Sequence, residues 1–348
     1  MFSGPGLVFV GERDCKVEEV EVDESSLGPG EVVVDLEVSV ISAGTEVANF
    51  TGLDPRTRVP GSWNEYPHRP GYGAVGTIVA VGPPSTGPNR GLAVGDRVFA
   101  ICRHARYAVA DTKRRPIVKI SPDDNAKSIV LGRMASVSIT AVRKATTVDL
   151  GARAVVVGLG MVGNFAAQLL QLSGMNVLGL DQAEGRVAMA RATGLEAAVA
   201  TAGNARATVE RSLGAGGDLV VEASGVPDAV PTAVAVARDG GEVVLLGSPR
   251  GVYSGDATDL LYLVHSRGIR VIGALEWLLP LDSGPWQARW SLQEDYATLF
   301  DLLRRGQLKT TGLVSHVVPP AQAQEIYSRL ADRQPGMGAV LFDWRTGA

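Results

Sequence analysis

Short apolar runs alternate with helical stretches over the central part of the chain. The runs are rich in valine, leucine and isoleucine, and the segments that join them are rich in alanine and have apolar residues at helical spacing. Parallel strands covered on both faces read as continuous apolar runs, and crossover helices connect them. The pattern therefore predicts a doubly wound parallel sheet, with strands at 153–158, 176–181, 196–200, 218–224, 242–247 and 269–274.

The N-terminal part has a different pattern, which is β-rich. Segment 31–42 is dense in valine and partly alternates, as a half-buried strand does, and 76–82 and 96–101 are further short apolar segments bounded by turn residues. Long loops at 51–70 and 82–95 separate these strands, and loops of that length in a compact domain are often functional.

The remaining segments are predicted to be mainly helical. Residues 128–145 have helical periodicity, and two more helices are expected at 293–305 and 320–332, before a last strand at 339–344. The whole pattern is that of an α/β chain with two dissimilar parts. Its length of 348 residues also suits two domains better than one.

Composition excludes several classes of function. The net charge of −4 and the absence of basic clusters argue against a nucleic-acid partner. The N-terminus lacks a basic leader before a long apolar segment, and no apolar run is long enough to span a bilayer, so neither export nor membrane insertion is expected. Two cysteines, Cys15 and Cys102, form one disulfide at most, which fits a cytoplasmic protein.

The strongest chemical signal is a glycine motif after the first central strand. Gly158, Gly160 and Gly163 make G-x-G-x-x-G, and the motif opens an amphipathic helix that starts near Met161 and Val162. Glycines let the backbone approach a pyrophosphate, and a helix N-terminus offers free N–H groups and the positive end of its dipole. The motif predicts a dinucleotide site, although a tight turn in another kind of doubly wound protein is the alternative.

Residues after the next strands refine the cofactor prediction. Asp181, at the end of the second strand, can accept hydrogen bonds from both ribose hydroxyls and would repel a 2′-phosphate, so NAD(H) is favoured over NADP(H). Arg186 either weakens this preference or is a solvated helix residue. Further cofactor contacts are expected at the carboxyl ends of two later strands, from Ser224, Gly247 and Ser248.

Taken together, these segments resemble the medium-chain dehydrogenase/reductase superfamily, of the alcohol and sorbitol dehydrogenase type. The resemblance covers nearly the whole chain and is carried by GPGEVVVDLEVSVISAGTEVANFTG, PGYGAVGTIVAVG, VGDRVFA, VVVGLGMVG, DLVVEASG, GGEVVLLGS and GLVSHVVPPAQAQEIYSRL. It implies a GroES-like β-barrel catalytic domain at 1–130, completed by 285–348, and a Rossmann domain at 131–284. It also implies a homodimer formed through edge strands of the nucleotide-binding fold.

The resemblance does not extend to the positions of the zinc ligands. Zinc members carry cysteine, histidine and carboxylate or cysteine ligands at the places that here hold Ala43, Tyr72 and Arg133, and these side chains cannot form a tetrahedral zinc site. The segment for a structural zinc is also missing. His68 lies four residues before the ligand position and is expected to be a loop or surface histidine. The sequence thus predicts a member without zinc.

Other side chains must then handle charge and protons at the reacting oxygen. Thr45 aligns with the hydroxyl residue that relays protons in zinc members, and Tyr72 places a phenol where a ligand is lost. Glu46 would orient a substrate hydroxyl or position the donor. Plain packing or turn chemistry is the alternative for each of the three.

Three further residues are candidates for substrate binding. His104 is expected on a barrel strand, either in contact with substrate or as a hydrogen-bonded core histidine. Arg133 would bind a substrate carboxylate or phosphate, or pair with Glu46. Trp277 is the first tryptophan of a tryptophan-rich run, 274–290, that forms either a wall of the substrate cleft or a domain or subunit interface.

These observations favour an NAD(H)-dependent, zinc-independent oxidoreductase that interconverts a secondary alcohol and a ketone. The segments SVISAGTE, LLGSPRG and VHSRGIRVIGA look most like a branch near bacteriochlorophyllide dehydrogenases and sugar or cyclitol dehydrogenase-like proteins. This resemblance implies a small-molecule substrate such as a polyol, sugar, cyclitol or natural-product intermediate. The alternatives are an NAD(P)H-dependent enone or quinone C=C reductase, which Asp181 disfavours, and a non-catalytic NAD-binding family member.

Overall fold

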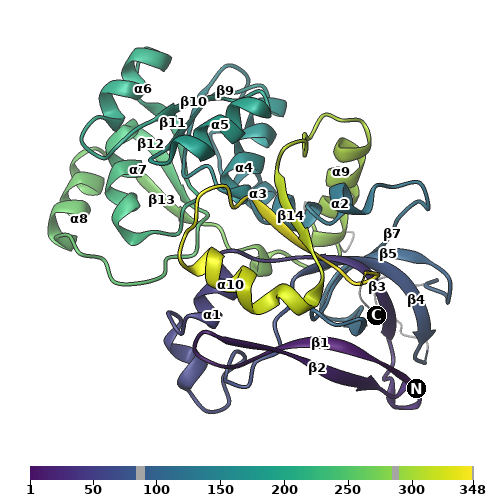
Figure 1. The fold of residues 1–348 in the computed structure, drawn as a ribbon. Coiled ribbons are helices and arrows are strands. Elements are labelled where there is room, and N and C mark those ends of the chain that lie inside the picture. Colours follow the sequence, from purple (N-terminus) through teal and green to yellow (C-terminus); the bar gives the residue numbers. More distant parts are fainter. Residues whose placement is uncertain (84–90, 284–289, 347–348) are drawn as a thin grey trace. The chain divides into compact units, whose positions relative to one another are not determined.

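The computed structural model describes residues 1–83, 91–283 and 290–346 (Figure 1). The chain forms two compact units. Unit 1 contains Met1–Arg133, Leu279–Arg304 and Val314–Ala348, and unit 2 contains Met134–Leu278 and Arg305–Leu313. Among the described residues, no helix is long and apolar enough to cross a membrane. Both cysteines are free thiols.

Unit 2 is built on a six-stranded parallel sheet, so the prediction of a doubly wound sheet is confirmed. The strand order is β10-β9-β8-β11-β12-β13, and it reverses at β8, the first of these strands in the chain. Such a reversal is the place where doubly wound sheets bind nucleotides. The strands are β8 (Arg153–Val157), β9 (Asn176–Asp181), β10 (Glu196–Val199), β11 (Gly217–Glu222), β12 (Ala237–Leu245) and β13 (Arg270–Gly273).

Both faces of this sheet are covered by helices, which explains the continuous apolar runs. Successive residues of a strand point to opposite faces, so Ala154 and Val156 belong to one core and Val155 and Val157 to the other. Helices α3, α4 and α5 cover the first face, and α6, α7 and α8 cover the second (Figure 1). Their bounds are α3 (Gly132–Lys144), α4 (Met161–Leu172), α5 (Glu184–Ala192), α6 (Ala205–Leu213), α7 (Val230–Val236) and α8 (Ala257–Ser266).

Unit 1 contains a seven-stranded sheet that is mostly antiparallel. The strands follow the path β14-β15-β3-β4-β5-β7, with β6 paired to β3, and β14 runs parallel to β15. The predicted fold class, an α/β chain with a β-rich part and a Rossmann part, is confirmed. The strands are β3 (Glu31–Val40), β4 (Gly73–Val81), β5 (Arg97–Ile101), β6 (Tyr107–Asp111), β7 (Ile117–Lys119), β14 (Val314–Val318) and β15 (Ala339–Asp343).

An N-terminal hairpin, which the pattern analysis did not predict, adds a two-stranded sheet to unit 1. It consists of β1 (Phe2–Gly11) and β2 (Asp14–Val22), which are antiparallel (Figure 1). The buried side chain of Phe9 packs edge-on against Phe50 and Tyr327, with ring centroids 5.5 and 4.9 Å apart. This contact anchors the hairpin to the core of unit 1.

The helix predicted at 128–145 is in fact two helices. Helix α2 (Ala126–Ile129) ends before two fully buried residues, and α3 starts at Gly132. A Cβ at Gly132 would lie 2.5 Å from the Phe300 ring, so close packing requires glycine where the chain changes direction. The other helices of unit 1 are α1 (Thr45–Phe50), α9 (Leu292–Arg304) and α10 (Ala323–Ala331).

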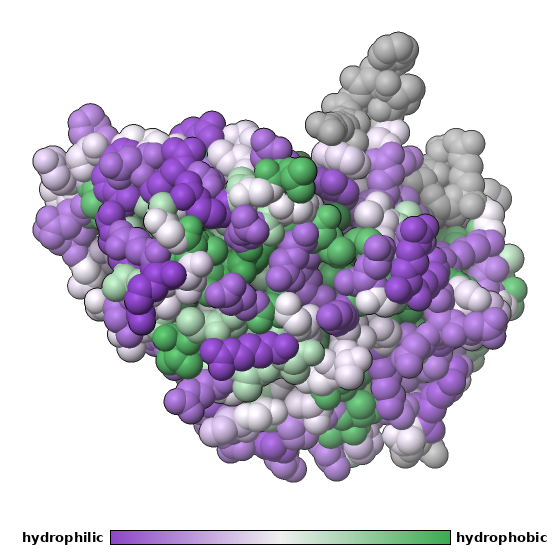
Figure 2. Space-filling model, turned by 90° about the horizontal axis from the view of Figure 1, so that it is seen from above, coloured by the Kyte–Doolittle hydropathy of each residue, from purple (hydrophilic) through white to green (hydrophobic). Residues whose placement is uncertain are grey.

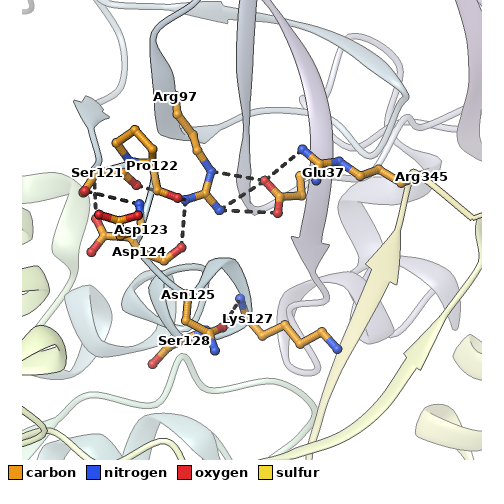
Figure 3. Close-up of polar contacts among 10 residues, drawn as sticks. All are labelled: Glu37, Arg97, Ser121, Pro122, Asp123, Asp124, Asn125, Lys127, Ser128 and Arg345. Carbon is orange, nitrogen blue, oxygen red and sulfur yellow. Dashed lines mark hydrogen bonds and ion pairs between the residues drawn. The ribbon is translucent and has the colours of Figure 1, made fainter.

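Arg97 of β5 holds the loop that precedes α2 (Figure 3). Its guanidinium pairs with Glu37 of β3 at 3.2 Å, and Arg345 pairs with the same carboxylate at 3.2 Å. The side chain of Asn125 then caps α2 by accepting from the backbone N–H of Lys127 at 3.0 Å. Arg97 Nη1 donates to the loop carbonyl oxygens of Ser121, Pro122 and Asp124 at 3.0, 3.1 and 2.7 Å.

Figure 2 shows one face of the molecule, on which hydrophobic residues form small groups among polar and charged ones. Several large apolar side chains are exposed in unit 2. Leu261 and Tyr262 of α8 are 67% and 69% exposed, and α8 has no fully buried residue. The apolar side of this helix is therefore only partly covered by its own unit.

Candidate functional site

The glycine motif lies between β8 and α4, and each of its glycines meets a different constraint. Gly158 has a φ of +92°, which favours glycine, and a Cβ there would lie 2.9 Å from Ser224. A Cβ at Gly163 would lie 1.8 Å from the carbonyl oxygen of Gly158, so the helix packs directly on the turn. A Cβ at Gly160 would meet nothing within 4 Å among the described residues. Space is thus left at the second glycine, where a phosphate would approach.

Helix α4 begins immediately after this open position. Gly160 is its N-cap and provides no capping side chain. The N–H groups of Met161 and Val162 belong to the first turn, where helical N–H groups have no intrahelical partner. The helix N-terminus therefore offers donors and a positive dipole end to a bound anion.

Asp181, at the end of β9, is only 8% exposed and faces the glycine turn. Its Oδ2 accepts from the backbone N–H of Leu159 at 2.8 Å, and its Oδ1 accepts from that of Ala183 at 2.9 Å. Each carboxylate oxygen has capacity for one more hydrogen bond, which suits ribose hydroxyls. Arg186 Nη1 lies 3.6 Å from Oδ2, so the predicted cofactor residues Asp181 and Arg186 form an ion pair.

Residues at the ends of β11 and β12 lie against each other on the same edge of the sheet. A Cβ at Gly247 would lie 2.2 Å from the backbone nitrogen of Gly225, and one at Gly225 would lie 2.7 Å from the carbonyl oxygen of Ser248. Ser224 is exposed here. The predicted cofactor residues of unit 2 are thus brought together around the carboxyl ends of β8, β9, β11 and β12.

Glu222, which the pattern analysis missed, organises this edge. The carboxylate is buried and accepts from the backbone N–H of Ser224 at 2.8 Å, from the Ser224 hydroxyl, and from the N–H of Gly225 at 3.3 Å. Burial raises the pKa of Glu222, and the hydrogen bonds from Ser224 and Gly225 oppose that rise. A carboxylate inside an apolar strand, DLVVEAS, was the signal in the sequence that could have identified it.

In unit 1, two of the three positions aligned with zinc ligands are in direct contact. The guanidinium carbon of Arg133 lies 4.1 Å from the centroid of the Tyr72 ring, and Arg133 is 1% exposed. A Cβ at Gly73 would lie 2.5 Å from Arg133 Cβ, so β4 starts tightly against this side chain. Ala43, at the third position, is exposed in the turn before α1. Among the described residues, no group of three His, Cys, Asp or Glu side chains could hold a metal ion.

Glu46 lies in α1, one residue after Thr45, at the centre of a buried polar network. Its Oε2 is 3.1 Å from His104 Nε2 and accepts from the hydroxyl of Tyr327, while Oε1 accepts from the N–H of Ser42 at 3.0 Å. The ion pair of this carboxylate is with His104, whereas Arg133, the alternative partner of Glu46, stacks on Tyr72. Burial, together with the charge of Glu46, raises the pKa of Tyr327 well above its usual value.

The network continues from His104 to the C-terminal segment. His104 Nδ1 is 2.7 Å from the Ser39 hydroxyl, and the indole of Trp344 donates to that hydroxyl at 2.8 Å. Because a carboxylate oxygen accepts, the Nε2 of a neutral His104 carries the proton that faces Glu46, and Nδ1 then accepts from the Ser39 hydroxyl. His104 lies in the turn before β6 and not on a strand as predicted, because its backbone N–H bonds Pro70 instead. It is a buried, fully hydrogen-bonded histidine.

Of the remaining predicted residues, Thr45 contacts this network through Ser42. Thr45 is the first residue of α1 and is half-buried, and its N–H donates to Ser42 Oγ at 3.3 Å. Trp277 lies in unit 2 after β13 and is 37% exposed. The tryptophan-rich run continues through 284–289, which lie outside the described residues, as do residues 84–90 of the second long loop.

His68 is half-buried rather than a simple surface residue. Its backbone pairs with Phe9 through two hydrogen bonds of 2.7 and 2.9 Å. Burial lowers the pKa of the imidazole, while Glu46 raises it and Arg103 lowers it further. The ring lines a pocket of about 660 Å³ in unit 1, built mainly from the first long loop, which the sequence analysis marked only as potentially functional.

Comparisons with known proteins agree with this geometry. Residues 161–280 match the family described as Zinc-binding dehydrogenase. The D-guloside 3-dehydrogenase of Shigella flexneri is 25% identical, with 91% of this chain and 93% of that protein covered. The 2-desacetyl-2-hydroxyethyl bacteriochlorophyllide A dehydrogenase of Cereibacter sphaeroides is 26% identical, with 98% of both chains covered. The crystal structure of galactitol-1-phosphate dehydrogenase from Escherichia coli superposes with a TM-score of 0.79 at 18% identity, over 97% of this chain and 99% of that one.

A parallel sheet with an open glycine turn in one unit and a mostly antiparallel sheet in the other is also the fold of the solved dehydrogenase that the chain superposes on. Residues 161–280 match the zinc-binding dehydrogenase family and the chain is similar over most of its length to dehydrogenases, so the prediction of an alcohol dehydrogenase-like dehydrogenase is confirmed. The predicted resemblance to medium-chain, zinc-type dehydrogenases is thus supported as a similarity, and the loss of the zinc sites stays a prediction.

Proposed function

We propose that this dehydrogenase interconverts a secondary alcohol and a ketone with NAD(H) and without zinc. The observation that carries the proposal is the stack of Arg133 on Tyr72, at two positions where zinc members hold metal ligands. When bound, the nicotinamide cofactor supplies or accepts the hydride. The side chains of this protein then have to manage the proton and the charge on the substrate oxygen.

The residues at the ligand positions do not fit a zinc ion. A guanidinium is cationic at every accessible pH and would repel a divalent cation placed beside it. Tyr72 carries its phenol on the ring that Arg133 covers, and Ala43 has no donor atom. The chemistry of this donor set therefore supports a zinc-independent reaction.

Tyr72 is the proposed proton donor and acceptor. As a neutral phenol it donates a hydrogen bond to a carbonyl oxygen, and the adjacent guanidinium favours the negative charge that develops when the proton leaves. Thr45, at the start of α1, is a second hydrogen-bonding group or a proton relay. Glu46 and His104 have their polar atoms engaged in the buried network, so they are proposed to position α1 rather than to contact substrate.

The preference for NAD(H) over NADP(H) is supported by Asp181. Its carboxylate is fixed by two backbone N–H groups, so it cannot easily turn away from a 2′-phosphate. Arg186 is the opposing feature because its guanidinium, 52% exposed, pairs with the same carboxylate. We propose that this pairing reduces, without reversing, the discrimination against NADP(H).

A polyhydroxylated or natural-product substrate is proposed from the relatives, which act on a guloside and on a bacteriochlorophyllide. A homodimer through the edge of the nucleotide-binding sheet is proposed from unit 2. There β13 has β12 as its one neighbour among the described strands, and Val271 on it is 43% exposed. Sedimentation of wild type against Val271→Lys tests the dimer, since a charge on a paired edge strand disfavours pairing.

The test of the proposed function compares Tyr72→Phe with wild type in a screen of secondary alcohols and ketones, followed by NADH absorbance. Removing one proton donor is expected to lower kcat by about 10²–10⁴-fold, the usual contribution of general acid–base catalysis. The stack on Arg133 stays, so the thermal stability should change little. Tyr262→Phe, at an exposed tyrosine of α8, is the matched control and should retain full activity.

Other outcomes would favour the rival functions. Turnover of an activated C=C bond with no alcohol or ketone would identify an enone reductase. Tight NADH binding with no transfer of deuterium from labelled NADH to any candidate would favour a non-catalytic protein. Stoichiometric zinc in the purified protein, together with loss of activity on chelation, would contradict the zinc-independent reaction.

A further inference from the structure

The pocket in unit 1 has a composition that the proposed chemistry does not explain. It has a volume of about 660 Å³, within the range of pockets that bind small ligands. Its lining includes two arginines, a histidine and two aromatic rings. The residues on which the argument depends are Trp63, Glu65, His68, Arg69 and Arg103.

This pocket shares its backbone with the segment that carries Tyr72. The N–H of Cys102 donates to the carbonyl of Tyr72 at 3.1 Å, and the N–H of His104 donates to that of Pro70 at 2.9 Å. A Cβ at Gly71 would lie 2.3 Å from Arg103 Cα, so the two segments are packed backbone to backbone. Arg103 is therefore held next to the residue that precedes the proposed proton donor.

The charge of the pocket is positive. Arg103 is exposed, and its guanidinium makes no hydrogen bond or ion pair with any described residue. Arg69 pairs with Glu18 at 3.2 Å, outside the lining. The one carboxylate of the lining, Glu65, already accepts from the N–H of Gly61 at 2.7 Å. A cation without a partner in a pocket favours an anionic ligand.

Trp63 gives the pocket a flat apolar surface beside these charges. Its ring is held edge-on to His68 at 5.7 Å, with the Arg56 guanidinium 5.7 Å from its centroid, yet the residue is 58% exposed. A rigid indole held in this way can cover one face of a ligand ring. The pocket thus combines a stacking surface with a fork-shaped cation.

We propose that this pocket binds a carboxylate or phosphate group on a ring-shaped substrate, with Arg103 as the main partner of the anion and Trp63 beneath the ring. Arg69 adds a second guanidinium, which strengthens the positive electrostatic potential of the pocket. The inference deepens the proposed function and rests on it, because it gives the polyhydroxylated substrate an anionic group. Planar guanidinium groups bind both oxyanions in a bidentate way, so the chemistry is shared between the two.

The test measures binding to the full-length protein by calorimetry, with three matched probes: glucose, glucuronate and glucose 6-phosphate. Wild type is expected to bind at least one of the two anions about tenfold or more tightly than glucose, as a charge-assisted bidentate contact gives. The anion that binds more tightly identifies carboxylate or phosphate as the source. Arg103→Gln should remove that difference and leave the affinity for glucose unchanged, whereas Arg114→Gln, at an exposed arginine of unit 1, should bind as wild type does.

Equal binding of the three probes by wild type would overturn the proposal, as would an Arg103→Gln protein that keeps the full preference for an anion. A Trp63→Phe variant adds a second measurement, with weaker binding of the ring-shaped anion but not of inorganic phosphate. Failure of this proposal can be distinguished from failure of the proposed function. Anion binding without any hydride transfer would contradict the function alone, and turnover of alcohols by a wild-type protein that binds the three probes equally would contradict the pocket alone.

Discussion

Gly163→Ala is expected to lower both the free energy of unfolding and the NADH affinity. Gly160→Ala is expected to lower only the NADH affinity, although both substitutions add one methyl group to the same motif. At Gly163 the new Cβ would lie 1.8 Å from a backbone oxygen, where Cβ contacts below 3.0 Å essentially do not occur. The turn or the helix must move by about 1 Å, and overpacking of this kind costs about 1–3 kcal/mol. The NADH affinity and the free energy of unfolding should both decrease.

At Gly160 the new methyl group meets no atom of the described residues within 4 Å, and φ is −61°. A lower entropy of the unfolded chain contributes about 0.4–1 kcal/mol, and the poorer N-cap offsets most of it, so the net change should stay within about 0.5 kcal/mol. The methyl group instead fills the space where a pyrophosphate approaches the helix. The Kd for NADH should therefore rise about tenfold or more, which is about 1.4 kcal/mol or more of binding free energy.

Urea unfolding measures the stability change, and titration of NADH fluorescence measures the affinity. Gly11→Ala, in the hairpin of unit 1, is the control because its added Cβ also meets nothing within 4 Å. Wild-type NADH affinity in Gly160→Ala would refute the reasoning, since the cofactor would then not approach this turn. Wild-type stability in Gly163→Ala would show that helix α4 does not need the close contact.

Three further predictions concern single polar side chains. Asp181→Ala should raise kcat/KM with NADPH relative to NADH by about tenfold or more, measured at matched cofactor concentrations, because the repulsion of a 2′-phosphate is lost while Arg186 remains; an unchanged ratio would contradict the proposed cofactor preference. Tyr327→Phe should lower the free energy of unfolding by about 1.5–3 kcal/mol, the range for a hydrogen bond to a charged group, and an unchanged urea midpoint would rule out that contribution. The pKa of Asp218 is lowered, mainly by hydrogen bonding to Arg153. Its contribution to stability is therefore present above the ordinary carboxyl pKa and is lost as the pH falls through the pKa of the folded protein. Asp218→Asn should therefore destabilise the protein at pH 7 and have a smaller effect near pH 3, and equal losses at both pH values would contradict this origin.

The parallel sheet could be predicted from the sequence because its strands are buried on both faces. Val155 and Val156 belong to different cores, so the run RAVVVG has no polar interruption that could hide it. The hairpin of unit 1 was not predicted because β2 alternates charged and apolar residues over a short length, after a turn with no Asn-Gly or Asp-Gly signal. Phe9, which packs the hairpin against the core of unit 1, has its partners Phe50 and Tyr327 at distant positions in the chain.

The candidate sites also differ in how far the sequence alone could predict them. The glycine motif and Asp181 follow local spacing rules, so the sequence alone named the residues and the reason for each. The sequence named Tyr72 and Arg133 only as two positions that align with zinc ligands. Nothing in their spacing predicts that the guanidinium lies 4.1 Å from the centroid of the ring. The partners of Glu46 lie 58 and 281 residues away, which no pattern within a window can connect.

The return of the C-terminal segment to the first sheet has a consequence for synthesis on the ribosome. Strand β3 pairs with β15 through Val38–Val40 and 341–343, so unit 1 lacks a strand until residues 339–343 have been translated. Meanwhile 134–278 of unit 2, with all six strands of its sheet, have left the exit tunnel. The nascent protein is therefore expected to complete its nucleotide-binding sheet before Tyr327 and Trp344 can join the buried network of Glu46 and His104. A stop codon that removes the last ten residues would leave unit 2 foldable and unit 1 permanently unfinished.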